Sequence, residues 1–511
     1  TLALLVGFSI LAIFLFRSTP SGFVPDEDRG MIFANVSMPP GTTIEKTEET
    51  IMKLDSIYES MDVIDARMSV AGFSLLNRVS AGSYAFSIMK LKDWSERGAD
   101  SLSVNATMQR LYATTAGFND AQIIYFTPPS IQGFGTSSGF EVQLQSKTGE
   151  DWNSINDVKN QFLGALNARP EVQYAISQFD PGFPQFDLDI DMEKVKMAGL
   201  TATDIFNALQ GYFGGIYATD FNRFGKQYRV MIQAKPEDRA NENSLNHIFV
   251  RNGDGESVAV SQFVDLKKIY GPEVVQRFNL LSSVSITGVP NPGYSTGDAI
   301  TAIEEVAAEV LPNSYTYDYS GLTREESNAG AQTIIIFILS LVFVYFLLSA
   351  QYESYILPFS ILLSLPFGIA GAILFINLAG LQNNIYFQIA LIMLIGLLAK
   401  NAILIVEFAL QRRKAGLSLF DAAADGARAR LRPILMTSFA FIFGLLPLAL
   451  SSGIGAIGNQ SIGVSAVGGM LVGTILGVFI IPVLFVVFQA LQEKISGKPE
   501  ELQFVKQCLI I

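Results

Sequence analysis

Six long apolar runs stand out along the chain. They cover residues 1–16, 333–350, 356–378, 385–410, 433–450 and 464–487. A helix that crosses the hydrocarbon of a bilayer needs about 20 mostly apolar residues, so each run predicts a membrane-spanning helix. The first run is short and starts at Thr1, with no basic residues before it such as a signal peptide carries. We therefore expect the chain to begin within a helix as a fragment of a longer protein, with a split or truncated gene product as the alternative.

Residues 17–332 follow a different pattern, in which charged helix-like stretches alternate with short strand-like ones. The short loop 411–432 is basic, and its basic residues are Arg412, Arg413, Lys414, Arg428, Arg430 and Arg432. Because short loops rich in Lys and Arg stay in the cytoplasm, this loop is predicted to be cytoplasmic. Counting spans backwards places residues 17–332 outside, in the periplasm of a Gram-negative cell. Helical spacing of apolar residues over 417–430 predicts an amphipathic helix on the inner membrane surface.

The large insertion repeats one order of elements. Strand-like and helix-like stretches within 30–133 follow the order β-α-β-β-α-β of a ferredoxin-like unit. A second such unit is predicted at 139–183 and 273–321, with 184–272 inserted into it as a separate subdomain. The predicted fold class is an α-helical membrane protein of six transmembrane helices with a large periplasmic α+β region of ferredoxin-like subdomains. The membrane part comprises 1–16 and five helices within 333–487, and 488–511 is predicted to be a cytoplasmic tail.

Composition excludes several classes of protein. Of the 511 residues, 50% are hydrophobic and 16% are charged, which is too apolar for an ordinary soluble protein and too charged for a wholly embedded one. The net charge of −12 argues against a nucleic-acid partner. Cys508 and His247 are the single cysteine and the single histidine, so we expect neither a disulfide nor a metal site. No nucleotide-binding loop or nucleophile motif indicates an enzyme, and we expect no cofactor.

The last apolar run contains Gly469, Gly473 and Gly477 at four-residue spacing. Small residues at this spacing form one smooth helix face, which predicts close packing against a neighbouring helix.

One cation lies inside an apolar run. Lys400 is about two-thirds of the way along 385–410, more than two helical turns from the basic loop. A lysine at that depth costs roughly 2.5 to 3.5 kcal/mol on insertion scales, so it should face protein or water and find a partner. Snorkelling to the interface is the alternative. Asn401 beside it, Thr437 on the next span and Arg430 near the cytoplasmic end of that span predict a polar relay.

Acidic groups are scarce in the same region. None of the six runs contains an aspartate, so this chain supplies a cation without an aspartate to accept a proton. Glu407 lies on the same helix face as Lys400, two turns further along. We expect it to form a salt bridge with Arg412 or Arg413, or to be an entry or release point for protons.

Several strings along the chain resemble those of the resistance-nodulation-division (RND) exporters of the AcrB type, the hydrophobe and amphiphile efflux pumps. They are GLLAKNAILIVEFA at 396–409, RARLRPILMTS at 428–438, LKDW at 91–94 and PGYSTGDA at 292–299. The order of one span, a periplasmic insertion and five further spans is similar to the C-terminal half of these proteins. By this resemblance, Lys400, Arg430 and Thr437 match relay residues of the family, whose paired intramembrane aspartates belong to the N-terminal half.

The resemblance implies an inner-membrane homotrimer that exports amphiphilic small molecules in exchange for protons. It also implies three partners besides the lipid bilayer: the N-terminal half of the same pump, a periplasmic adaptor protein, and an outer-membrane channel of the TolC type. The inserted subdomain 184–272 would then face that channel. A metal-ion exporter of the same superfamily and a non-transporting receptor or scaffold on the same fold are the alternatives.

Substrate contacts are also predicted from the resemblance. The segment 71–83 looks like the switch loop between two drug pockets, with Phe73 and Leu75 at its tip. Position matching places a further set of side chains in or near the deep pocket, namely Met68, Phe86, Ile88, Phe140, Val142 and Leu144. The alternative for these strand residues is ordinary sheet core. Met68, Leu75, Ile88 and Val142 stand where drug exporters often have phenylalanine.

Overall fold

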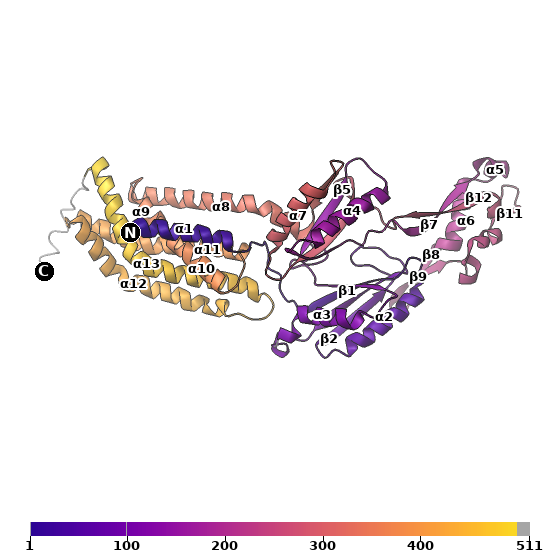
Figure 1. Ribbon diagram of the computed structural model, residues 1–511, viewed down its shortest axis with the longest axis horizontal. Helices are drawn as coiled ribbons and strands as arrows, with labels where there is room; N and C mark the ends of the chain where they lie inside the picture. Colours follow the sequence, from indigo (N-terminus) through magenta and orange to yellow (C-terminus); the bar gives the residue numbers. More distant parts are fainter. Residues whose placement is uncertain (1, 99, 498–511) are drawn as a thin grey trace. The chain divides into compact units, whose positions relative to one another are not determined.

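A computed structural model describes residues 2–98 and 100–497 (Figure 1). The chain divides into two compact units, of which the smaller is Asp180–Glu273 and the larger comprises the rest. The larger unit contains a helix bundle and two α/β subdomains. Each unit has a hydrophobic core of its own.

The helix bundle is built from the apolar runs of the sequence (Figure 1). Its helices are α1 (Leu2–Ser18), α8 (Gly321–Tyr352), α9 (Pro358–Leu362), α10 (Leu365–Leu378), α11 (Ile385–Lys414), α12 (Leu419–Ala449) and α13 (Ala456–Ser496). Within the described residues, 5 helical stretches are long and apolar enough to cross a membrane, with α9 and α10 together forming one of them. The apolar part of α1, Val6–Ser18, is shorter.

Three helices are longer than the apolar pattern predicted. Helix α8 begins at Gly321, before its apolar run, and α13 continues to Ser496. Residues 419–430 do not form a separate helix but continue directly into α12, which contains Pro433. The proline removes one backbone hydrogen bond and yet leaves the helix unbroken, as neighbouring helices often permit in membrane proteins. Cys508 lies outside the described residues.

Close packing of α13 depends on two of the three glycines that the sequence singled out. A Cβ atom added at Gly469 would overlap Leu394 Cδ1 and lie 2.9 Å from the carbonyl oxygen of Gly368. At Gly473 it would lie 2.6 Å from Leu398 Cδ2, whereas at Gly477 it would meet only Ile481 Cδ1 at 3.3 Å. The smooth face therefore ends after Gly473.

We expect Gly469→Ala to destabilise the bundle by about 1–3 kcal/mol, because overpacking forces backbones apart or side chains out of their rotamers. The measurement is thermal unfolding of the purified full-length protein in detergent. Gly477→Ala on the same helix is the matched control and should leave the melting temperature nearly unchanged. Equal effects of the two variants would contradict this account of the packing.

The first α/β subdomain has the element order β-α-β-β-α-β. Its elements are β1 (Met31–Ser37), α2 (Ile44–Glu59), β2 (Ile64–Ala71), β3 (Tyr84–Leu91), α3 (Val104–Thr115) and β4 (Gln122–Phe126). The sheet order is β2-β3-β1-β4, and all neighbouring strands are antiparallel. Buried residues from β1, β3, α2 and α3 form one core, so the helices cover one face of the sheet.

The second α/β subdomain is discontinuous in sequence. Its elements are β5 (Phe140–Ser146), α4 (Trp152–Asn167), β6 (Val172–Ile176), β13 (Gln276–Phe278), β14 (Leu281–Pro290), α7 (Thr296–Val310) and β15 (Tyr315–Tyr319). The sheet order is β13-β14-β5-β15, with β6 also paired to β14. The sheet therefore joins strands from both sides of the inserted unit.

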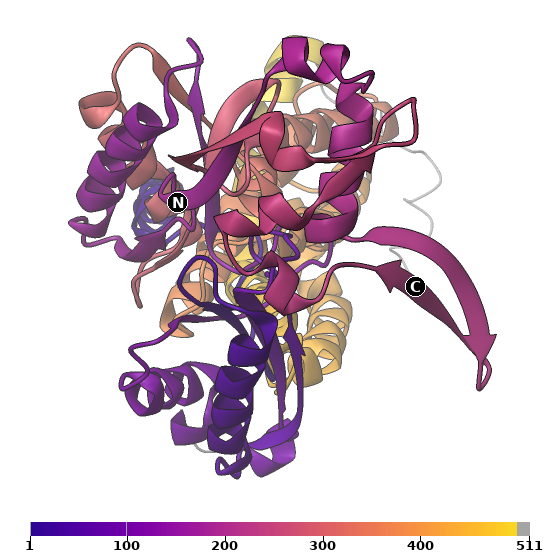
Figure 2. The same ribbon diagram turned by 90° about the vertical axis from the view of Figure 1, so that its right-hand side faces the viewer.

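The smaller unit is joined to the rest of the chain by the antiparallel pair β7 (Phe183–Ile190) and β12 (Val264–Gly271). It contains α5 (Met192–Met197), α6 (Ala202–Leu209), β10 (Phe249–Arg251) and β11 (Ser257–Ala259). The hairpin of β8 (Ile216–Arg223) and β9 (Lys226–Ile232) stands away from the rest of this unit as a two-stranded ribbon (Figure 2). Every residue of β8 is exposed. His247 is also exposed, at the end of a short 3-10 helix.

The segment between α1 and β1 is tied to the loop between α10 and α11. The amide of Gly22 donates to the carbonyl of Asn383 at 3.0 Å, and the amide of Asn383 donates to the carbonyl of Pro20 at 2.9 Å. The amide of Ile385 donates to the carbonyl of Phe23 at 3.0 Å. These backbone bonds fix the point where the chain leaves α1 for the first α/β subdomain.

Candidate functional site

Lys400 lies in the interior of α11, and its side chain is exposed on the surface of the bundle. The ion pairs that α11 forms within the described residues are both near its C-terminal end. They join Arg412 to Asp425 at 2.7 Å and Arg413 to Glu493 at 2.8 Å. An uncompensated cation on an otherwise apolar helix surface is costly in lipid, so this face is suited to contact a carboxylate or water.

Asn401, the next residue, points into the bundle and is 6% exposed. Its amide nitrogen Nδ2 donates to Ser438 Oγ on α12 at 3.1 Å, and Thr474 Oγ1 on α13 lies 3.0 Å from the same oxygen. The structure thus joins Asn401 to Ser438 rather than to Thr437. The hydroxyl of Thr437 donates to the carbonyl of Ile434 in its own helix at 3.1 Å, and the residue is exposed. Ser438 and Thr474 were not predicted from the sequence, although both are hydroxyl residues inside apolar runs.

Arg430 lies away from Lys400. Its guanidinium carbon is 4.7 Å from the centre of the Phe408 ring, and that of Arg412 is 5.1 Å from the centre of the same ring. Phe408 is eight residues beyond Lys400, which corresponds to about 12 Å along a helix. Arg430 and Lys400 are therefore not direct partners in this structure.

The prediction that Glu407 forms a salt bridge with Arg412 or Arg413 is wrong. Both arginines proposed for it pair elsewhere, with Asp425 and Glu493. Glu407 accepts a hydrogen bond from Gln411 Nε2 at 3.1 Å, one turn away on its own helix.

The open face of the first sheet carries several residues predicted to contact substrate. Phe86 and Ile88 on β3 are half-buried and alternate with buried Ala85 and Met89. The ring centroid of Phe73, from the loop 71–83, lies 5.7 Å from that of Phe86 in an edge-on arrangement. Met68 lies opposite Ile88 in the register of the two strands and is 52% exposed. Leu75, in the same loop as Phe73, is half-buried.

Two further aromatic residues belong to this first-sheet region and were missed by the sequence analysis. Phe33 on β1 lies opposite Ile88 in register, and its ring centroid is 5.7 Å from that of Phe126 on β4. The strand-like character of the run that contains Phe33 was the available signal.

Phe140, Val142 and Leu144 have another role. They are 1%, 0% and 0% exposed and belong to the core between the second sheet and its helices. The prediction that they line a pocket is not supported by this structure, because alternation in a strand identifies a buried face without saying what buries it.

The loop 71–83 is held at several points. The amide of Gly72 donates to the carbonyl of Tyr84 at 2.7 Å, and the amide of Ser74 donates to the carbonyl of Val79 at 2.8 Å. Ser74 Oγ also donates to Asn35 Oδ1 on β1 at 3.1 Å. Phe73 is therefore presented from a folded loop.

A cavity of 910 Å³ lies in the larger unit and is lined by both α/β subdomains. Tyr112 and Tyr125 from the first subdomain and Tyr174 from the second contribute to its wall, as do Asp26 and Glu27 from the segment after α1. Its size is typical of a site for a small organic molecule, and its lining mixes aromatic and aliphatic side chains with many polar ones, which suits an amphiphile.

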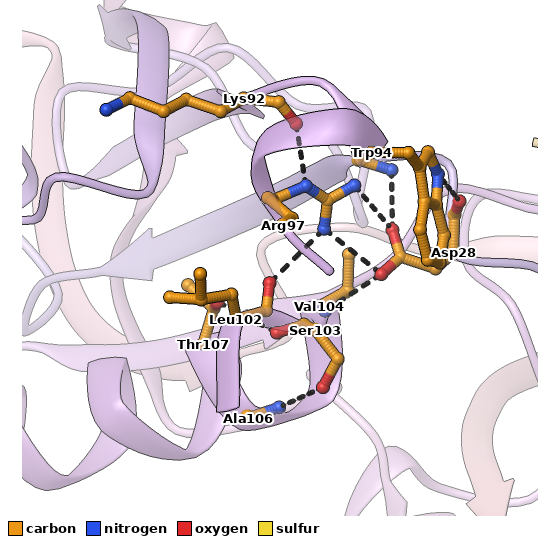
Figure 3. Close-up of polar contacts among 10 residues, drawn as sticks. Asp28, Lys92, Trp94, Arg97, Leu102, Ser103, Val104, Ala106 and Thr107 are labelled. Carbon is orange, nitrogen blue, oxygen red and sulfur yellow. Dashed lines mark hydrogen bonds and ion pairs between the residues drawn. The ribbon is translucent and has the colours of Figure 1, made fainter. Parts of the chain in front are cut away.

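Asp28 and Trp94, which also line this cavity, belong to a polar clamp (Figure 3). The Asp28 carboxylate accepts hydrogen bonds from two nitrogens of Arg97, at 3.1 and 3.2 Å. It also accepts a hydrogen bond from the amide of Val104 at 3.0 Å. The Arg97 side chain is 2% exposed, and its guanidinium lies 5.0 Å from the centre of the Trp94 ring. The clamp fixes the segment after α1 to the first turn of α3.

The next residue back, Glu27, binds the bundle. Its carboxylate oxygens accept hydrogen bonds from the amides of Gly455 at 2.8 Å and Gly458 at 3.1 Å, at the N-terminus of α13. A carboxylate at a helix N-terminus satisfies free amides and is stabilised by the helix dipole. Consecutive acidic residues thus tie one short segment to both a subdomain and a membrane-length helix.

The model of the AcrB/AcrD/AcrF family matches residues 1–489. The chain belongs to this family. The family resemblance identified from the sequence strings is therefore confirmed.

Relatives of this AcrB-family chain include exporters of several kinds of compound. It is 38% identical over 493 residues to the antibiotic efflux pump membrane transporter ArpB of Pseudomonas putida, covering 95% of the chain and 46% of that protein. It is 38% identical over 482 residues to the toluene efflux pump membrane transporter TtgB of Pseudomonas putida strain DOT-T1E, covering 94% and 45%. It is 34% identical over 481 residues to the multidrug export protein AcrF of Escherichia coli strain K12, covering 93% and 46%. The chain spans about half the length of these relatives.

Glu326 is one of several acidic residues of this AcrB-family chain with an altered pKa. Glu326, near the start of α8, accepts a hydrogen bond from Thr296 Oγ1 on α7 at 2.7 Å. Burial raises its pKa from 4.5 to about 7, and hydrogen bonds from Thr296 and the Phe23 amide oppose that shift. The group is therefore poised to change charge near neutral pH.

We expect Glu326→Gln to stabilise the protein increasingly as the pH rises. Below about pH 4.5 the carboxyl is neutral in both the folded and the unfolded state and contributes nothing to the difference. Between about pH 4.5 and 7 the unfolded state ionises first, so the wild type loses stability that the glutamine variant keeps. The measurement is the difference in melting temperature between variant and wild type at several pH values. Glu325→Gln, at an exposed neighbour, is the control; a Glu326→Gln difference that does not change with pH would contradict the assignment.

Proposed function

We propose that this chain is the C-terminal half of an inner-membrane transporter that exports drugs and other amphiphilic compounds by proton antiport. The observation that carries the proposal is Lys400, a cation inside a membrane-length apolar helix whose side chain is open to a partner. The names of the relatives, which include antibiotic, toluene and multidrug exporters, support the substrate class.

Lys400 would act as one half of an electrostatic switch. An ammonium near a carboxylate favours the ionised acid, and protonation of the acid releases the ammonium. Because an unpaired charge in a membrane is costly, the two states differ in which helix faces can stay in contact. The carboxylate would come from the N-terminal half of the transporter, facing α11 and α12. The low burial of the membrane-length part of α12, 11% within this chain, supports a face that another part of the protein covers.

Substrate would follow two surfaces of the α/β subdomains, which we assign as ferredoxin-like porter subdomains at 30–133 and at 139–183 with 273–321. The 910 Å³ cavity would receive amphiphiles, since its lining combines apolar and polar side chains. The open sheet face around Phe73, Phe86 and Ile88 would line the deeper pocket. Its mixture of aromatic and aliphatic side chains makes few fixed hydrogen-bond demands, which suits diverse ligands.

The larger assembly is also a proposal. The chain would act within a homotrimer together with a periplasmic adaptor protein and an outer-membrane channel of the TolC type. The inserted unit 184–272 would form the surface that faces the channel. The exposed β8–β9 hairpin supports a contact there, because a long ribbon with no core of its own gains stability from a partner.

The test is dye efflux from cells that lack their own exporters and carry the full-length protein containing this chain. We expect preloaded dye to leave faster than from cells with an empty vector, and a protonophore to stop this at constant ATP. Efflux that survives the protonophore but stops on ATP depletion would refute proton antiport. A rate equal to that of the empty vector, with the protein present in the membrane, would favour the receptor or scaffold alternative.

A further inference from the structure

Helices α11 and α12 each carry two consecutive polar residues at the level of Lys400. On α11, Lys400 is exposed and Asn401 is 6% exposed; on α12, Thr437 is exposed and Ser438 is 2% exposed. Each pair thus sends one polar side chain outward and the next one inward. The inward residues are the ones joined by the 3.1 Å hydrogen bond.

A third helix completes the contact. Thr474 on α13 is 5% exposed, and its hydroxyl lies 3.0 Å from Ser438 Oγ. Ser438, which lies on α12, therefore accepts hydrogen bonds from both α11 and α13 and links the three helices. The cavity beside Asn401 and Thr474 measures only 10 Å³.

Helix geometry links the buried contact to the exposed pair. Successive residues of an α-helix are about 100° apart around its axis. When Asn401 and Ser438 are held toward each other, the rotation of both helices is set, and with it the directions of Lys400 and Thr437. A rotation of α11 sufficient to move the lysine would break the buried hydrogen bond.

We propose that Ser438 and Thr474 are positioning residues for Lys400, and that with Asn401 they form a three-helix lock that sets where the ammonium group is presented. The inference rests on the proposed proton antiport and adds residues that act through Lys400 rather than on the proton itself. Hydrogen bonds between membrane helices average only about 0.6 kcal/mol. Loss of the lock should therefore lower the stability of the fold only slightly, and its main effect should be on the position of the lysine ammonium.

The placement of the ammonium can be read from the pH dependence of transport. Moving a cation about 1 Å further from a carboxylate some 4 Å away raises the carboxylate pKa by about half a unit. For Ser438→Ala and Thr474→Val we expect the half-maximal pH of dye efflux to move upward by about that amount or more. Thr474→Ser keeps the hydroxyl and should restore the wild-type profile.

A buried serine outside the lock is the matched control. Ser465 on α13 is 0% exposed, and its hydroxyl donates to the Ser461 carbonyl in its own helix. Ser465→Ala should leave the pH profile in place. Efflux is measured across external pH for each variant of the full-length protein, together with the melting temperature and the amount in the membrane.

The outcomes separate the lock from the function it rests on. A pH profile that moves in Ser438→Ala and Thr474→Val, but not in Ser465→Ala, supports the lock. Unchanged profiles with merely fewer active molecules would mean that the contact only holds helices together. Wild-type efflux that is indifferent to a protonophore would overturn the proposed function itself.

Discussion

Lys400→Ala is expected to reduce dye efflux to the level of cells without the transporter while the protein still reaches the membrane. The variant removes the cation that would alternate between a bound and a released state, so protonation of the partner acid no longer changes any contact. A single charge crossing 100 mV yields about 2.3 kcal/mol, and transport without that coupling loses its driving force. The measurement is the initial rate of dye efflux at matched membrane abundance with the proton gradient intact.

Lys414→Ala is the matched control, because this lysine closes the same helix at its C-terminal end. It should keep wild-type efflux. If Lys400→Ala also keeps it, the lysine has no part in a relay, and the coupling of efflux to protons must rest on other residues. Loss of assembly in Lys400→Ala would instead assign the residue to packing against its partner half.

The largest effect on stability is expected from Arg97→Ala. It leaves the Asp28 carboxylate, which is 17% exposed, without the two guanidinium bonds shown in Figure 3. Removing one partner of a buried ion pair costs about 3–5 kcal/mol, because the other charge stays buried and unpaired. We expect a marked fall in the melting temperature of the purified full-length protein and faster proteolysis near the start of α3.

The exposed pair Lys90–Asp65 provides the comparison. Its atoms are 3.5 Å apart and its side chains are 56% and 53% exposed, so Lys90→Ala should cost less than about 1 kcal/mol. The double variant Asp28→Asn with Arg97→Ala should lose less stability than the two single variants added together. Full additivity would show that the two side chains act independently.

The pattern of apolar and polar residues predicted an element correctly wherever one physical requirement applies along that whole element. Apolar runs of about 20 residues predicted the membrane-length helices, because a helix across lipid must be apolar over its whole length. Strand-like stretches predicted within 30–133 likewise formed strands, among them Met31–Ser37 and Tyr84–Leu91. Helix ends were less predictable, since polar residues such as those before Pro433 can continue a helix outside the apolar part.

The sequence by itself therefore determined the five membrane-length helices, the order of the α/β elements and the family, and it singled out Lys400 as a cation inside an apolar run. Only the tertiary structure decided which polar neighbours meet: Asn401 binds Ser438 and not Thr437, and Glu407 pairs with neither arginine. It also decided that Phe140 lies in a core while Phe86 lies on an open sheet face. The physical reason is that hydrophobicity and helix length act along the chain, whereas hydrogen-bond partners depend on the rotation and packing of elements distant in sequence.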